Sequence, residues 1–309
     1  MTITPRKGAI GAIVALLILG ACQVGSSTSP SASGAVSASA SAAASPVAQV
    51  PAQQLIFAGK LVACIDIPYP PQEMFDDNGN PTGSDVDLGA EIAKRLGLSY
   101  VVENSVFDTI IAAVTGGKCD FIISAQNITA DRVKQVDMIP YFEAGQSFVV
   151  AKGNPKNIKA ETDLCGNKIA VEKGTTEADY IQGTGDYTGQ GLSKKCTDAG
   201  KPAINLQQFD KDSDALLALT SGDVDAYFAD SPVAGYYTVQ HPEQFALSGL
   251  TLGVAKEGIS VAKGHEALRD GIVTALKSMM DDGTYDQILD KYGLKDFGLK
   301  SSDVVAVTK

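Results

Sequence analysis

The sequence predicts an α/β protein with two sheets, each built mainly from parallel strands. Three observations support this fold class. Short apolar runs alternate with amphipathic helical segments, the alternation starts near residue 61 and again near residue 168, and polar residues follow several of the runs. Strands separated by helices indicate βαβ units, so the second start indicates a second lobe. A chain of 309 residues is long enough for two units of ordinary size.

The first half of the pattern gives three strands and two helices. Apolar runs predict strands over residues 61–65, 99–102 and 121–123. Apolar side chains at i, i+4 and i+8 from Leu88 to Leu96 predict a helix over residues 86–96. A second helix carries an apolar face made of Phe107, Ile110, Ile111 and Val114.

The second half repeats these features. The predicted strands cover residues 168–171, 204–206 and 226–228. Thr175 and Thr176 can cap a helix, and residues 215–220 form another. Near the C-terminus, Leu268, Ile272 and Leu276 predict a longer helix, and a shorter one follows over residues 285–292.

The N-terminus has the order of a secretory signal over residues 1–21. Arg6 and Lys7 precede fourteen uncharged residues and then Cys22. This run is shorter than the about 20 residues that a membrane span needs. Leu19-Gly20-Ala21-Cys22 resembles the lipobox of bacterial lipoproteins, which implies that Cys22 becomes a lipid-bearing N-terminus. An ordinary cleaved signal with an incidental Cys22 is the alternative.

The segment that follows is predicted to be a disordered tether over residues 22–54. It consists almost entirely of Ser, Ala, Gly, Pro, Val and Gln and has no charged residue. Such a composition buries too little apolar surface to offset the entropy of ordering. The folded part therefore begins at about Leu55.

Composition excludes several functions. The 25 Lys and Arg against 36 Asp and Glu give a net charge of −11, which argues against a nucleic-acid partner. Two His and five Cys leave little for a metal centre. We therefore expect neither a metal nor another cofactor.

Polar residues gather where the predicted strands end. Four follow strands, namely Asp66, Ser124, Asn127 and Asp230, and Arg132 and Thr176 lie at predicted helix starts. Ligands of open α/β sheets bind beyond the carboxyl ends of strands. A guanidinium can grip a carboxylate, and a carboxylate can accept hydrogen bonds from an ammonium. This set complements a zwitterion.

Seven short motifs occur in a fixed order over more than two hundred residues. They are Asp66-Ile67-Pro68-Tyr69-Pro70-Pro71, Gly83-Ser84-Asp85-Val86-Asp87-Leu88, Gly117-Lys118-Cys119-Asp120, Asn127-Ile128-Thr129-Ala130-Asp131-Arg132, Gly174-Thr175-Thr176, Asp223-Val224-Asp225-Ala226 and Asp282-Gly283-Thr284-Tyr285. From about Lys60 to Gly293 the chain resembles the polar amino-acid-binding proteins of ABC importers, solute-binding protein family 3.

The resemblance implies a two-lobed fold like that of type II periplasmic binding proteins, with two crossing hinge strands. Lobe 1 would comprise residues 55–144 and 259–309, and lobe 2 residues 145–258. It also implies an extracytoplasmic receptor, anchored by lipid to the outer face of the bacterial cell membrane, that delivers a polar or basic amino acid to an ABC permease. We expect a monomer.

The family's binding residues carry over position by position. Arg132 would bind the α-carboxylate with Asn127 and the backbone of Thr176. Asp230 would bind the α-ammonium with Ser124 and the backbone of Ala125. Tyr69 and Phe107 would flank the ligand side chain, and Asp66 lies where binders of basic amino acids contact its far end. Gln72 and Glu177 depart from the usual residues and make the pocket more polar.

Several of these residues have an alternative role. Arg132 can be a solvated charge, Asp230 a helix cap before Pro232, Asp66 a turn residue, and Phe107 a core residue. The function has alternatives too. Cyclohexadienyl and arogenate dehydratases resemble these binders, and Asp66 or Glu177 could supply the acid that such an enzyme needs. A sensor with a membrane signalling partner would use the same site.

Apart from Cys22, four cysteines remain in a chain that we expect to be exported. Cys165 and Cys196 bracket a loop-rich segment of lobe 2, so we expect them to form a disulfide. Cys64 and Cys119 lie near opposite ends of adjacent predicted strands, which would hold their Cα atoms too far apart. We therefore expect this second pair to be buried thiols.

Overall fold

The computed structural model describes residues 45–309. Ten strands run in the order β1 (Lys60–Ile65), β2 (Met74–Phe75), β3 (Pro81–Thr82), β4 (Ser99–Asn104), β5 (Phe121–Ile122), β6 (Val136–Ala151), β7 (Lys168–Glu172), β8 (Asn205–Phe209), β9 (Ala226–Asp230) and β10 (Phe245–Ala262) within these residues. The α-helices there are α1 (Ser84–Arg95), α2 (Ile110–Thr115), α3 (Ala130–Gln135), α4 (Thr176–Gln182), α5 (Leu192–Asp198), α6 (Asp212–Ser221), α7 (Ser231–Gln240), α8 (Glu266–Asp281) and α9 (Thr284–Lys291).

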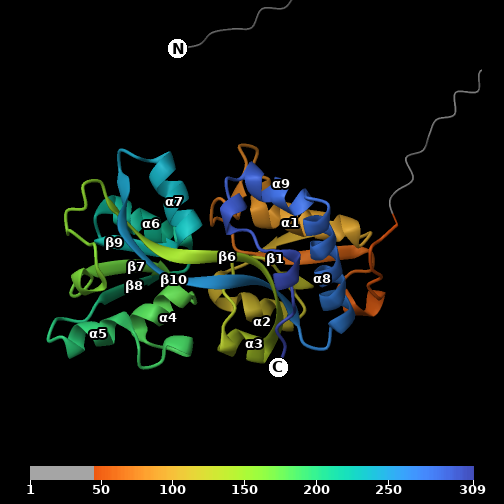
Figure 1. Ribbon diagram of the computed structural model, residues 1–309, viewed down its shortest axis with the longest axis horizontal. Coiled ribbons are helices and arrows are strands. Elements are labelled where there is room, and N and C mark those ends of the chain that lie inside the picture. The colour runs from red at the N-terminus through yellow and green to blue at the C-terminus, as the bar shows by residue number, and fades with distance from the viewer. Residues whose placement is uncertain (1–44) are drawn as a thin grey trace, which may run out of the picture. The chain divides into compact units, whose positions relative to one another are not determined.

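Two parallel half-sheets form the two lobes, as predicted. In one, β1 pairs in parallel with β4 and β5, and in the other β7 pairs in parallel with β8 and β9. Helices α1, α9, α2 and α3 surround the first half-sheet, while α6 and α7 lie on one face of the second and α4 and α5 on the other (Figure 1). The α/β class and the two-lobed architecture are confirmed.

The two half-sheets are continuous, whereas the sequence predicted two separate sheets. The strand order is β4-β1-β5-β10-β6-β9-β7-β8. The long strands β6 and β10 run antiparallel to each other between the lobes and join the two halves (Figure 1). They carry no clean alternation of apolar and polar residues, which is why periodicity did not reveal them.

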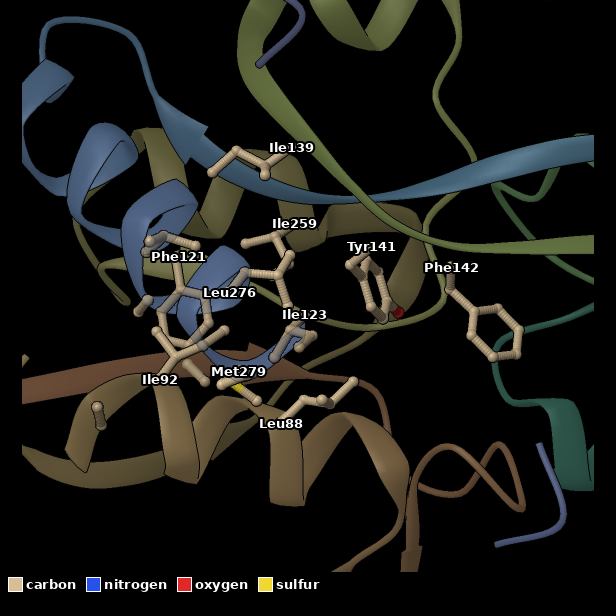
Figure 2. Close-up of a cluster of buried hydrophobic side chains, with 14 of the residues drawn as sticks. Leu88, Ile92, Phe121, Ile123, Ile139, Tyr141, Phe142, Ile259, Leu276 and Met279 are labelled. Carbon is tan, nitrogen blue, oxygen red and sulfur yellow. The ribbon is translucent and has the colours of Figure 1, made fainter. Parts of the chain in front are cut away.

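The largest apolar core stabilises the lobe that contains β1. Side chains from α1, β5 and α8 fill it, including Leu88, Ile92, Phe121, Leu276 and Met279, all fully buried (Figure 2). Burial of a side chain of this size contributes about 1.5–3 kcal/mol. These helices and strands are therefore a rigid support for the loops at the strand ends.

The predicted tether ends earlier than residue 54. The Val47 N–H donates to the carbonyl oxygen of Arg95 at 2.9 Å, and Gln54 Oε1 accepts from the N–H of Leu268 at 2.9 Å. Val50 packs against the core of the first lobe. The Gln54 amide thus satisfies an otherwise unpaired N–H in the first turn of α8. Residues 45–54 belong to the folded body, while the predicted signal and Cys22 lie outside the described residues.

The prediction for Cys64 and Cys119 was wrong. They form a disulfide with their Cα atoms 5.6 Å apart, and Cys165 and Cys196 form the second one, as expected. The error came from treating Cys119 as part of an extended strand. β5 begins only at Phe121, and the chain turns at Gly117, which has φ +74°. This turn brings Cys119 back beside β1.

Replacing both Cys64 and Cys119 with alanine is expected to lower the free energy of unfolding by about 4 kcal/mol. The estimate is the loop-closure entropy for a cross-link over 55 residues. Denaturant unfolding of both proteins without reductant measures it. Alkylation of either cysteine in the denatured, unreduced wild-type protein would contradict the disulfide.

Within residues 45–309, no helix has the length and apolar character needed to cross a membrane.

Candidate functional site

A small cavity of about 10 Å³ lies where the loops of the two lobes meet. This is about the room that a single water molecule needs, so the lobes must part to admit a larger molecule. All nine residues predicted to bind a ligand line it: Asp66, Tyr69, Phe107, Ser124, Ala125, Asn127, Arg132, Thr176 and Asp230. Four further residues complete the lining, namely Glu73, Glu172, Thr175 and Glu177.

Arg132 is a fixed, buried cation in this cavity. Its Nη1 donates to the carbonyl oxygen of Asn127 at 2.8 Å and its Nη2 to that of Gly174 at 3.0 Å. The guanidinium also lies over the Phe107 ring, 5.4 Å from the centroid. Both hydrogen-bond partners are neutral carbonyls, so the charge stays available for an anion. Arg132 is not the solvated charge of the alternative interpretation, and Phe107 is half-buried beside the cavity rather than in a core.

Asp230 is a buried carboxylate with one oxygen left unpaired. Its Oδ2 accepts from the Tyr69 hydroxyl at 2.8 Å, and its own N–H donates to that hydroxyl at 3.0 Å. Its Oδ1 is buried without a hydrogen-bond partner. Asp230 precedes α7 but makes no side-chain cap. Burial raises the pKa of Asp230 to about 6, against the opposing effects of the Tyr69 hydroxyl and the neighbouring Asn127 amide.

The first turn of α4 closes the side of the cavity near Arg132. Thr175 caps the helix, with its hydroxyl accepting from the Ala178 N–H. Thr176 follows at the first helical position, where an N–H has no partner within the helix. The Thr176 hydroxyl accepts from Asn127 Nδ2 at 2.8 Å, which leaves Asn127 Oδ1 buried and unpaired.

Asp66 faces the cavity with both carboxylate oxygens engaged. Its Oδ1 pairs with the Lys211 ammonium from the other lobe, and its Oδ2 accepts from the Phe107 N–H at 2.5 Å. Ser124 accepts from the Asp66 N–H at 2.9 Å. Sequence reasoning predicted Asp66 as a contact for the ligand but did not foresee its pairing with Lys211.

Ala125 has an unusual backbone conformation with φ +43°. Its N–H donates to Asp85 Oδ2 at 3.0 Å, and Tyr141 donates to the same oxygen at 2.5 Å. Because the N–H is used in this way, Ala125 can offer a ligand only its carbonyl oxygen.

Three glutamates also line the cavity, and of these only Glu177 was placed in the pocket from the sequence, without a role in binding the ligand. Burial raises the pKa of Glu177 to about 8, with the charge of Asp230 adding to the rise. Burial also raises the pKa values of Glu73 and Glu172 well above the usual range, reinforced by the charges of Asp85 and Asp66 respectively. Glu172 ends β7, so the expectation that ligands bind beyond the ends of strands could have identified it. Gln72 bonds Glu257 Oε2 at 2.6 Å and does not line the cavity.

The cavity therefore has a positively charged corner at Arg132 and Thr176 and a corner of carboxylate and amide oxygens at Asp230 and Asn127. Both corners use residues that enter from opposite lobes. A small molecule with adjacent carboxylate and ammonium groups complements both.

Comparison with protein families agrees with this geometry. Residues 61–295 match the model of the bacterial extracellular solute-binding proteins, family 3. The chain belongs to this family. It shares 29% identity over 248 residues with ABC transporter arginine-binding protein 1 of Escherichia coli (strain K12), covering 76% of this chain and 91% of the relative. It is 31% identical over 220 residues to the ABC transporter glutamine-binding protein of Bacillus subtilis (strain 168), covering 70% and 74%.

Solved structures extend the comparison. An ancestral arginine-binding protein bound to arginine has a TM-score of 0.68 and 39% identity, and the match covers 76% of this chain and 98% of that one. The ancestral amino acid-binding protein AncCDT-1, described as a precursor of cyclohexadienyl dehydratase, has a TM-score of 0.64 and 32% identity over 76% and 95% of the two chains. This solute-binding protein is thus an amino-acid-binding protein of the ABC transporter type.

Proposed function

We propose that this solute-binding protein is a lipid-anchored receptor that captures a polar amino acid outside the cytoplasm and delivers it to an ABC importer. One observation carries the proposal. The buried, unpaired Oδ1 of Asp230 and the guanidinium of Arg132, held only by carbonyl oxygens, line the same cavity. An unpaired buried acceptor costs about 1–3 kcal/mol, and an ammonium in the cavity removes that cost.

In the proposed complex the α-carboxylate lies on Arg132 and the Thr176 N–H. The α-ammonium donates to Asp230 Oδ1 and Asn127 Oδ1, with the Ala125 carbonyl and Ser124 nearby. Tyr69 and Phe107 flank the side chain, and Asp66 and the three glutamates line its polar surroundings. Relatives named for arginine and for glutamine support a polar side chain.

The ligand would stabilise the arrangement in which the lobes meet. We place the lobe boundaries at 144/145 in β6 and 258/259 in β10. A break in strand register between Glu257 and Gly258 supports a hinge at the second position. Because the carboxylate binds residues from both lobes, the ligand has a higher affinity for the closed arrangement and shifts the population toward it.

Affinity is expected to fall in acid. Asp230 has a raised pKa of about 6, so below this pH it takes up a proton and loses its charge. The dissociation constant should then rise about tenfold per pH unit below pH 6, the limit for one proton lost on binding. Calorimetric titrations at pH 7.5, 6.0 and 5.0 measure this. A constant affinity across the range would contradict the role of Asp230.

A thermal-shift screen against the twenty amino acids tests the proposed ligand class. An amino acid present at 100 times its dissociation constant stabilises the folded state by about 2.7 kcal/mol. We expect a clear rise in melting temperature for one or a few polar amino acids. No shift with any of the twenty would overturn the proposal.

Anchoring is tested at Cys22 in the full chain. We expect the wild-type protein to sediment with membranes and the Cys22→Ser variant to be released or retained as uncleaved precursor. Sedimentation of a processed Cys22→Ser protein with membranes would show that lipid at this residue is not the anchor.

The neighbour related to cyclohexadienyl dehydratase and the raised pKa of Glu177 support a second candidate, a dehydratase. A protonated carboxyl beside the substrate is what general acid catalysis requires. Incubation with prephenate or arogenate distinguishes the two. The receptor proposal expects no phenylpyruvate or phenylalanine above the buffer control.

A further inference from the structure

The charge of Asp66 is balanced within the protein. Its carboxylate lines the cavity, but Lys211 pairs with Oδ1 and the Phe107 N–H occupies Oδ2. The Asp66 side chain is 4% exposed, so water screens this pair weakly. A cationic ligand side chain that approaches Asp66 therefore meets a neutral ion pair, and not a free carboxylate.

Lys211 is held firmly in this position. It is the residue before α6 in the second lobe, and its ammonium reaches across to the first lobe. There it donates to Asp66, to the Ser105 carbonyl at 3.1 Å and to the Ile67 carbonyl at 3.4 Å. An ammonium has three donors, and all three are used. A competing cation would have to replace the whole set.

Three further acids around the side chain are buried and provide hydrogen-bonding capacity. Burial raises the pKa values of Glu73 and Glu172 well above the usual range and that of Glu177 to about 8. At neutral pH the carboxyl of Glu177 is mainly protonated, because its pKa of about 8 lies above that pH. Glu73 Oε1 and Glu177 Oε1 are buried without a partner and can serve a polar, uncharged group.

We propose that Lys211 is a specificity-determining residue, which cancels the charge of Asp66 and favours amino acids with an uncharged, hydrogen-bonding side chain over cationic ones. This inference rests on the proposed function and specifies which polar amino acids the site prefers. Glutamine represents the favoured class and arginine the disfavoured one.

The test compares calorimetric dissociation constants of the wild-type protein and Lys211→Met for glutamine and arginine at pH 7. Loss of the ammonium exposes the Asp66 carboxylate to the ligand, and unit charges a few ångströms apart interact strongly in a partly buried site. We expect the affinity ratio of arginine to glutamine to rise about tenfold or more, since 1.4 kcal/mol of charge interaction corresponds to tenfold.

Lys173→Met is the matched control. Lys173 also joins the lobes through an ion pair, with Asp108 at 3.0 Å, but its partner Asp108, unlike Asp66, does not line the cavity. A general weakening of lobe closure changes the affinities for arginine and glutamine equally and leaves their ratio unchanged. The double variant Asp66→Asn/Lys211→Met should return the ratio to near the wild-type value.

Two results would overturn the proposal. One is a ratio in Lys211→Met within twofold of wild type. The other is a wild-type protein that binds arginine or lysine ten times more tightly than any uncharged amino acid. A wild-type protein that binds none of the twenty would instead refute the proposed function.

Discussion

Arg132→Ala is expected to weaken amino-acid binding roughly 100-fold or more, because truncating one partner of a buried charge pair costs about 2–5 kcal/mol. The loss has two parts. The α-carboxylate loses its paired donors, and the carboxylate is left buried without a counter-charge. Calorimetric titration of the variant with the tightest-binding amino acid measures the effect.

Arg269→Ala serves as the control. Arg269, on α8, pairs with Asp137 at 3.0 Å, and neither residue lines the cavity. Its removal changes the net charge equally and should alter the dissociation constant less than twofold. An Arg132→Ala protein that keeps its fold and binds within threefold of wild type would refute the assignment of the carboxylate site.

Asp230→Asn is expected to have the second largest effect, a loss of affinity of roughly 30-fold or more. The loss arises because the buried α-ammonium of the ligand then faces an uncharged amide. The asparagine has the shape of the aspartate and can keep the hydrogen bond from Tyr69. The variant should also lose the acid dependence of binding, since the group with a pKa of about 6 is gone.

The fold should survive this substitution. A carboxyl whose pKa is raised in the folded state destabilises that state at pH values above the folded pKa, and the penalty declines as the pH falls from the folded pKa toward the unfolded one. Asparagine removes the penalty, so the melting temperature without ligand should not fall. Unchanged affinity in Asp230→Asn at pH 7.5 would exclude this residue as the ammonium partner.

The lobes could be predicted because their units obey local rules. Leu88, Ile92 and Leu96 repeat at helical spacing, and the strands beside them are continuous apolar runs. β6 and β10 follow neither rule, because β6 is buried along nearly its whole length and β10 alternates irregularly. Their place between the lobes was expected only from the family resemblance.

The site residues that lie at the ends of strands could be predicted. Asp66, Ser124 and Asp230 each follow or end a strand, and the topology brings them to one cavity. The Lys211–Asp66 pair joins residues 145 positions apart, and no local pattern marks it. The disulfide at Cys119 was missed for a similar reason, since a single turn at Gly117 decides its position.

Ligand derivatives that lack one of the two α-groups test the central claim most directly. The tightest-binding amino acid is compared by calorimetry with its α-amide, which lacks the carboxylate, and its Nα-acetyl derivative, which lacks the ammonium. If Arg132 and Asp230 bind the two α-groups, each derivative should lose roughly 100-fold in affinity, the cost of one unpaired buried charge. Derivatives that bind within threefold of the parent amino acid would contradict the account.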